Sequence, residues 1–484
     1  MSQRQRLTLV AAIVGSALVS VDSSIVNVAL PAIEHDLGGG LAAQQWVSNA
    51  YLLSLASLIL VGGSVGDIYG ERRVFTIGVA AFGVVSLVCA LAPGIGVLIA
   101  ARALQGAAAA LITPSSLAII VAAFTERERG AAIGSWTAWG GIASVVGPLA
   151  GGLIVDQLSW RWIFALNIPL AAATLLLVRA AVPASAPVSK RRIDVIGACL
   201  GAAALAGVVF ALIEQPHYGW ASAAIVVPLV GGLVCAVAFV GYERRASEPM
   251  LELELFSHRN FAVGNLETLS MYAGLGIFFF YLTIYVQQVA GYTALQAGLA
   301  TLPVTLVMFA LSRRFGALAD RFGPRLFMGA GPVVAAIGLL LLLGLGEHVS
   351  YLTDLLPGLL LFSLGLAVTV APLTATVLAD ADQADAGIAS AVNNAVARIA
   401  SLIGVSAVGI VVARTLVGDT FAHNQESVRA FHDTIAICAA LLAAGGLAGA
   451  IGIVNPQRPC DAEGCAGGQL YGAPRPAVVS GARR

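Results

Sequence analysis

Apolar runs long enough to cross a membrane follow one another almost from end to end of this 484-residue chain. A helix of about 20 apolar residues spans the ~30 Å hydrocarbon core of a bilayer. Because 58% of the residues are hydrophobic and only 11% are charged, the composition excludes an ordinary soluble protein. The 54 glycines suit helices that pack closely without a hydrophobic force between them. We therefore expect an all-α membrane protein with no water-soluble catalytic domain.

The hydropathy pattern predicts fourteen spanning helices. Their expected ranges are 7–32, 44–66, 74–93, 96–122, 131–155, 162–182, 194–214, 221–242, 260–288, 296–318, 325–345, 353–378, 388–413 and 431–454. The first run is long, contains Asp22 and lacks a convincing small-residue cleavage site, so we interpret it as a spanning helix and not as a signal peptide.

Positive charge is distributed unevenly between these spans. If the N-terminus is cytoplasmic, 21 of the 26 Lys and Arg residues fall in cytoplasmic segments, as the positive-inside rule requires. Both termini are therefore predicted to be cytoplasmic. A high content of Ala, Gly and Arg with a single Lys indicates a GC-rich bacterial genome, and hence a multi-pass protein of the bacterial cytoplasmic (inner) membrane.

One short polar stretch occurs twice, each time at the cytoplasmic end of a predicted helix. It reads GSVGDIYGERRVF at 63–75 and GALADRFGPRLF at 316–327. Its glycines would allow close helix approach and a tight turn, and its Asp could accept bonds from a helix N-terminus or an Arg. A single copy would be a polar turn, whereas two equivalent copies favour a conformational gate. The predicted gating residues are Gly63, Asp67, Gly70, Arg72, Gly316, Asp320, Arg321, Gly323 and Arg325.

The spacing of the two copies indicates an internal duplication of six-helix units, as in transporters built from two rocking halves. The predicted divisions are an N-terminal half (1–182), a linker with two inserted helices (183–259) and a C-terminal half (260–454). Residues 455–484 are expected to form a disordered cytoplasmic tail.

From about Leu7 to Val454 the chain resembles the major facilitator superfamily, with the repeated stretch matching its signature loop. Further stretches resemble the fourteen-helix drug:proton antiporters of that superfamily: VDSSIVNVALP (21–31), LIAARALQGAAAA (98–110), SVVGPLAGG (144–152), WRWIFALNIP (160–169) and YLTIYVQQVAGYTALQAGLATLP (281–303). The resemblance implies the major facilitator fold. It also implies proton-coupled efflux of amphiphilic drugs or antibiotics by alternating access.

Asp22 and Arg102 are charged residues at comparable depths in predicted helices, and they could therefore meet. A charge in the bilayer costs at least ~2.5–3.5 kcal/mol, so each needs a partner, a water-filled cavity or a function. Our hypothesis is that Asp22 takes up a proton and that Arg102 tunes it. The alternative is a static ion pair that orients two helices.

Glu267 is the second candidate for proton coupling, and Arg398 lies at a depth from which the two could also pair. For a cationic substrate, Glu267 could face the positive charge directly. A structural salt bridge within the C-terminal half is an equally good interpretation. Which of Asp22 and Glu267 is the main proton carrier stays open.

The stretch GPLAGG on the fifth predicted helix favours a kink beside a tight interhelical contact, because proline removes a backbone donor and glycines let helices approach. The four residues of this antiporter motif are Gly147, Pro148, Gly151 and Gly152. With the family resemblance, we favour a contact that seals the pathway against proton leak over a merely well-packed helix. Predicted substrate-cavity residues are Gln105, Trp136, Tyr272, Glu267 and Arg398.

The expected partners are a small amphiphilic or cationic substrate, protons and membrane lipid, with no nucleic acid, and the chain is expected to be a monomer. No metal site or cofactor is predicted, because the histidines fall at loops or helix ends. No G-x-x-x-x-G-K-[ST] stretch exists, so ATP is not the expected energy source. Transport of an endogenous lipid, metabolite or siderophore stays an alternative. An enzyme or a channel is disfavoured, because no catalytic constellation appears and a channel would not need paired gating motifs.

Overall fold

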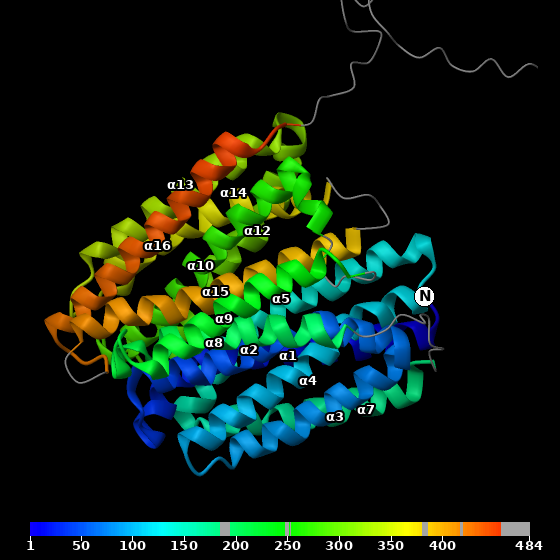
Figure 1. Cartoon of the computed structure of the whole chain (residues 1–484), viewed down its shortest axis with the longest axis horizontal. Helices are drawn as coiled ribbons and strands as arrows, with labels where there is room; N and C mark the ends of the chain where they lie inside the picture. The colour runs from blue at the N-terminus through cyan, green and yellow to red at the C-terminus, as the bar shows by residue number, and fades with distance from the viewer. Residues whose placement is uncertain (184–193, 247–250, 252, 380–385, 417–419, 456–484) are drawn as a thin grey trace, which may run out of the picture.

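The computed structural model describes residues 1–183, 194–246, 251, 253–379, 386–416 and 420–455, and these residues form helices and short connections (Figure 1). The first seven helices are α1 (Gln3–Leu37), α2 (Gly40–Tyr69), α3 (Glu71–Ala90), α4 (Ile95–Ala123), α5 (Glu126–Gln157), α6 (Arg161–Ala165) and α7 (Asn167–Ala181). Next come α8 (Val195–Tyr218), α9 (Ala223–Glu243), η1 (Leu253–Ser257), α10 (Arg259–Gln288), α11 (Ala294–Ala300), α12 (Leu302–Phe322) and α13 (Pro324–Leu340). The chain continues with η2 (Leu341–Gly344), η3 (Tyr351–Leu355), α14 (Leu356–Ala379), α15 (Ala386–Thr415) and α16 (Gln425–Gly452).

Fourteen helical segments of the described chain are long and apolar enough to cross a membrane, which confirms the predicted number. One of them combines α11 and α12, and Pro303 lies in the first turn of α12. Because proline has no backbone N–H and fits the first turn of a helix, the break between α11 and α12 lies next to Pro303. With the exception of Asn455, the predicted tail lies outside the described residues.

The helices pack as two groups that are distant in sequence. In the first group α2 packs on α4 and α1 on α5, and in the second α13 packs on α14 and α10 on α16. Figure 1 shows the first group, blue to teal, below the second, which runs from green to red. An even number of spans places residues 3 and 452 on one side of the membrane, and we call that end of the bundle proximal and the other distal. The predicted cytoplasmic location of the proximal end stays a prediction.

The distal halves of the two groups are joined by hydrogen bonds. Gln45 of α2 donates to the Val405 carbonyl of α15 at 2.7 Å. Gln287 of α10 donates to the Val28 carbonyl of α1 at 3.1 Å. Figure 1 shows the axes of the two groups spreading apart toward the end that carries the N-terminus. The structure is therefore a conformer closed at its distal end.

The contact between α5 and α11 is a close part of this distal closure, and it uses the antiporter motif. A Cβ on Gly152 would lie 2.6 Å from the Ala294 carbonyl oxygen of α11. Asp156, one turn further along α5, accepts the Ala294 and Leu295 backbone N–H groups at 3.0 and 2.9 Å. Asp156 thus caps the first turn of α11 across the boundary between the groups. Gly147 and Gly151 meanwhile face Ser24 and Ile25 of α1.

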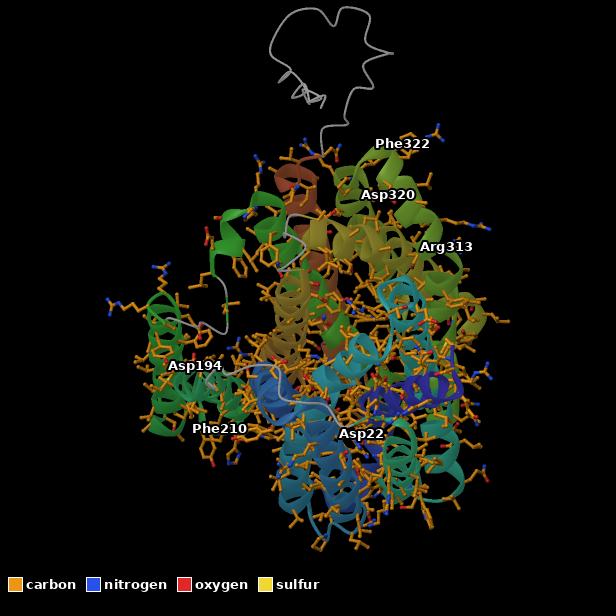
Figure 2. The ribbon with its side chains drawn as sticks, turned by 90° about the vertical axis from the view of Figure 1, so that its right-hand side faces the viewer. Asp22, Asp194, Phe210, Arg313, Asp320 and Phe322 are labelled. Atoms are coloured by element: carbon orange, nitrogen blue, oxygen red, sulfur yellow. The ribbon has the colours of Figure 1, made fainter. Side chains whose placement is uncertain are left out.

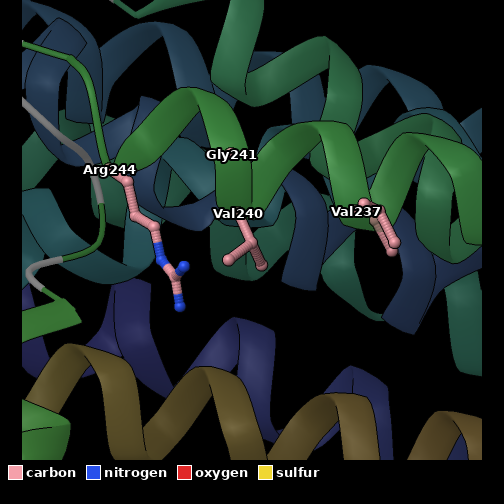
Figure 3. Close-up of a pocket in the computed structure, with 5 residues that line it drawn as sticks. Val237, Val240, Gly241 and Arg244 are labelled. Carbon is pink, nitrogen blue, oxygen red and sulfur yellow. The ribbon is translucent and has the colours of Figure 1, made fainter.

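The two inserted helices form a hairpin beside this bundle. α8 and α9 pack on each other, and α8 also packs on α2 and α15. The outer surface of α9 is apolar, with Val237 at 74% exposure. Figure 3 shows a hollow of about 450 Å³ on this helix, lined by Val237, Val240, Gly241 and Arg244 among others. An apolar surface ending in an exposed Arg suits contact with membrane lipid.

Gly152→Ala is expected to weaken the distal closure, because the added methyl group would meet the backbone of α11, which cannot move aside as a side chain can. The measurement is the distance distribution between spin labels on the exposed residues Gln157 and Leu299, for which we expect an added longer component. The matched control is Gly140→Ala on the same helix, where an added Cβ meets nothing within 4 Å. Identical distributions for the two variants would contradict this account of the contact.

Candidate proton-coupling site

Asp22 lies in the interior of the first helix group and forms an ion pair with Arg102, which the comparable depths of the two residues allowed. Its Oδ2 is 2.5 Å from Nη1 of Arg102, and the two residues are 0% and 1% exposed. Figure 2 shows Asp22 within the blue group, away from the proximal Asp320. The pair joins α1 to α4 in the interior of the bundle, where little water screens the charges.

Two neutral donors complete the coordination of this carboxylate. Gln105 of α4 and Asn167 of α7 donate to Oδ1 of Asp22 at 3.0 and 2.8 Å. Ser86 of α3 accepts a second hydrogen bond from Gln105 at 2.8 Å. Three donors from two helices therefore surround the Asp22 carboxylate, which in its ionised form can only accept hydrogen bonds.

Arg102 is fixed on its other sides as well. Its Nε donates to the Val47 carbonyl of α2 at 3.1 Å, and Nη1 also donates to Oε1 of Gln105 at 2.7 Å. The guanidinium lies 4.3 Å from the ring centroid of Tyr51, a distance at which a cation is attracted to the aromatic face. The position of Arg102 thus depends on α2 as well as on α1. A change in the charge of Asp22 would therefore alter contacts among α1, α2 and α4.

Ser86, Asn167 and Tyr51 belong to this cluster, although the sequence analysis did not select them. Asn167 does lie within WRWIFALNIP, and its place at the start of α7 turns its amide toward α1. Gln105, which was predicted to line the substrate cavity, is 0% exposed and belongs to the Asp22 cluster. In this conformer its amide is occupied by Asp22, Ser86 and Arg102.

The expected pairing of Glu267 with Arg398 is wrong. Glu267 is fully buried and lies against Gly449 of α16, where an added Cβ would be 2.6 Å from Oε2. Neither oxygen of this carboxyl has a hydrogen-bond partner among the described residues. The neighbouring position Thr268 faces α15 instead and accepts a bond from Asn393 at 2.8 Å. One residue along a helix turns the side chain by about 100°, so similar depth did not bring Glu267 to the α15 side.

Arg398 lies on the face of α15 that points toward α2. It precedes Leu402 by one turn and Val405 by two, and these residues pack near Trp46 and Gln45 of α2 and its neighbour α8. Its Nε is buried and donates no hydrogen bond to any described residue. The Arg398 guanidinium therefore lies at the boundary between the two groups, and its Nε has no hydrogen-bond acceptor among the described residues.

The two copies of the gating motif lie at the proximal end. Gly70 and Gly323 have φ values of 88° and 91°, which confirms turns that favour glycine. The tightest approach of α2 to α4 is at Gly62, whose added Cβ would meet the Ala110 carbonyl, and not at Gly63. Gly316 is in ordinary contact with Ala371.

The charged residues of this motif differ in their surroundings. Asp67 and Asp320 are exposed, and Figure 2 shows Asp320 at the edge of the second group. Arg325 donates to the Ala450 carbonyl of α16 at 2.6 Å, and so ties the second copy to its own group. Arg321 is exposed beside Phe322. Asp67 and Asp320 are therefore accessible in this distal-closed conformer, whereas Glu71 of the first copy is buried.

The two aromatic candidates for a substrate cavity are partly buried. Trp136 of α5 packs with Leu9, Ala12 and Ile120 of α1 and α4. Tyr272 of α10 packs against the large core cluster. The described residues contain no group of His, Cys, Asp or Glu that could hold a metal ion.

Asn167→Leu is expected to lower the free energy of unfolding by about 1–3 kcal/mol, because one oxygen of a buried charge loses a donor. Arg102→Met should cost more, ~3–5 kcal/mol, because it leaves the carboxylate without its counter-ion. Combining Arg102→Met with Asp22→Asn should recover much of that loss. Equilibrium unfolding in detergent measures all three. A double variant no more stable than Arg102→Met would show that the pair is not coupled.

Comparison with known proteins identifies the family to which this chain is similar. The family model of the Major Facilitator Superfamily matches residues 12–405. Multidrug resistance protein Stp of Mycobacterium tuberculosis (strain CDC 1551 / Oshkosh) is 37% identical over 429 residues, covering 88% of this chain and 80% of Stp. Puromycin resistance protein pur8 of Streptomyces alboniger is 37% identical over 407 residues, covering 82% of this chain and 80% of pur8.

A solved structure confirms the fold alone. The bacterial homolog of the human lysosomal transporter Spinster, described as inward-facing and unoccupied, superimposes with a TM-score of 0.67 at 12% identity, over 93% of this chain and 97% of that one. The predicted multi-pass location in the bacterial inner membrane is confirmed by the fourteen spans and the bacterial relatives. The chain is a transporter and not an enzyme, and it belongs to the Major Facilitator Superfamily.

Proposed function

We propose that this transporter exports amphiphilic drugs or antibiotics, cationic ones included, in exchange for protons. The related proteins are named for multidrug resistance and puromycin resistance, which supports efflux. The observation that carries the proton part is the fully buried ion pair of Asp22 and Arg102 in the interior of the first helix group. Inward movement of one charge down 100 mV supplies about 2.3 kcal/mol, before any pH gradient is counted.

In this proposal the distal-closed conformer holds Asp22 in its charged form. In the alternate conformer, open at its distal end, protonation from that side would remove the attraction to Arg102 and leave a carboxyl that donates as well as accepts. Arg102 would then keep only its bonds to Val47 and Gln105. The contacts between α1, α2 and α4 would change, and this change is the step that couples the proton to the helix movement.

The gating residues take part when the proximal ends close. Asp67 and Asp320 are exposed here, so each is available to accept bonds from the opposite group in the alternate conformer. Arg72 and Arg321 are the proposed basic partners near the same turns. The antiporter motif works at the other end, where Gly152 lets α5 touch α11 and seals the distal side. Closure would thus alternate between the two ends, as alternating access requires.

Glu267 has a different role in this account. A buried carboxylate without donors is costly when charged, and neither Glu267 oxygen has a hydrogen-bond partner among the described residues. It is a second candidate for proton coupling, but it does not face Arg398. The proposed substrate contacts are Trp136, Tyr272 and Arg398. We also propose that the protein is a monomer with both termini in the cytoplasm. Its two halves would be residues 1–182 and 260–454.

Asp22→Asn should abolish gradient-driven export, because the amide cannot take up and release the proton. The measurement is ethidium accumulation in inverted membrane vesicles under an imposed pH gradient, at equal protein abundance. The matched control is Asp36→Asn on the same helix, since Asp36 is exposed and pairs with Arg161 at the distal surface. We expect loss of at least nine-tenths of the accumulation for Asp22→Asn and nearly none for Asp36→Asn. Gradient-driven accumulation that survives Asp22→Asn would remove the central support for the proposal.

A further inference from the structure

The distal end contains a pocket that none of the functional residues above accounts for. Its volume is about 460 Å³, within the range of small-molecule sites. Four helices line it: α2 with Gln45 and Trp46, α4 with Ile95 and Ile99, α8 with Glu214 and His217, and α15 with Gly409 and Ala413. Because α8 supplies one wall, the inserted hairpin completes the pocket.

The chemistry of the lining favours a cation. Glu214 is its acidic residue, and none of the described residues that line it is Lys or Arg. Oε1 of Glu214 accepts the Trp46 indole N–H at 2.7 Å, which fixes the carboxylate in place. Its Oε2 accepts no hydrogen bond from the described part of the chain and is free for a ligand. A carboxylate beside aromatic rings attracts organic cations through both charge and ring faces.

Apart from the Gln45 amide, the rest of the lining is apolar or aromatic. His217 and Tyr218 pack edge to face with ring centroids 4.6 Å apart, and Ile95, Ile99 and Ile213 form a hydrocarbon wall. Trp46 is held by Phe210 of α8 at a centroid distance of 6.0 Å, and Figure 2 shows Phe210 on the hairpin. An occupant should therefore combine a positive charge with a bulky apolar body.

We propose that this pocket binds an amphiphilic organic cation at a site separate from the Asp22 cluster. The pocket is part of the distal closure, because Gln45 also donates to Val405 and to the Tyr281 hydroxyl, and Gly409 lies against the Gln45 amide. Separation of α2 from α15 would move two walls of the pocket apart and open it. The site therefore belongs to the distal-closed conformer, and this last step rests on the alternating access proposed above.

The test uses the full chain in nanodiscs without any proton gradient, with two probes of the same shape and opposite charge. Tetraphenylphosphonium is the cation and tetraphenylborate the anion. We expect the cation to bind more tightly, and Glu214→Gln to weaken its binding at least tenfold while leaving the anion unaffected. Glutamine can still accept the Trp46 N–H, so the variant removes the charge and keeps the hydrogen bond. The control is Glu347→Gln, a distal carboxylate outside this pocket.

Location is tested by a photoreactive phosphonium analogue whose attachment sites are mapped by mass spectrometry. Labelling of peptides from α2 and α8 that is lost in Glu214→Gln supports the site, and Trp46→Phe should keep the preference for the cation. Equal binding of both probes, wild-type affinity in Glu214→Gln, or labelling confined to other helices would overturn it. Since no gradient is used, these results are independent of the vesicle experiment that tests proton-driven export.

Discussion

The ion pair between Asp22 and Arg102 is the interaction on which the arrangement of the first helix group depends. Two opposite charges in the interior of a membrane protein are tolerated only when each satisfies the other and the remaining polar atoms are bonded. Here Gln105 and Asn167 join α4 and α7 to Asp22 of α1, and the Val47 carbonyl joins α2 to Arg102 of α4. The same pair therefore anchors the packing of these helices, and in the proposed mechanism it is also the place where a proton changes their contacts.

Glycine contacts decide where the rest of the molecule closes. Gly106 lies against the Tyr51 backbone, so α4 can approach α2 closely enough for Arg102 to reach Tyr51 and Val47. Gly152 lets the backbone of α11 reach α5 across the boundary between the two groups. Since membrane helices gain little from the hydrophobic effect against one another, such close backbone contacts carry much of the packing. The charged cluster and the distal closure thus depend on small residues at particular crossings.

The sequence was sufficient for the fold because span length and apolar character are properties of each segment alone. The fourteen spans follow from hydropathy, and comparable depth allowed Asp22 and Arg102 to meet, as they do in the structure. The pairing of Glu267 with Arg398 failed because depth does not define which side of the helix a residue faces. Asn167 and Asp156 were missed because a lone polar residue near a helix end is common in any membrane protein. Their roles arise only when α7 and α11 are placed beside α1 and α5.

Proton release on substrate binding tests the central role of Asp22 most directly. Purified full-length protein in weakly buffered solution, with a pH indicator and ethidium as the substrate, would report protons displaced by the dye. The account predicts release from the wild type and none from Asp22→Asn, provided that the variant still binds the dye. Equal release from both proteins would contradict it and would assign the exchanged proton to another group.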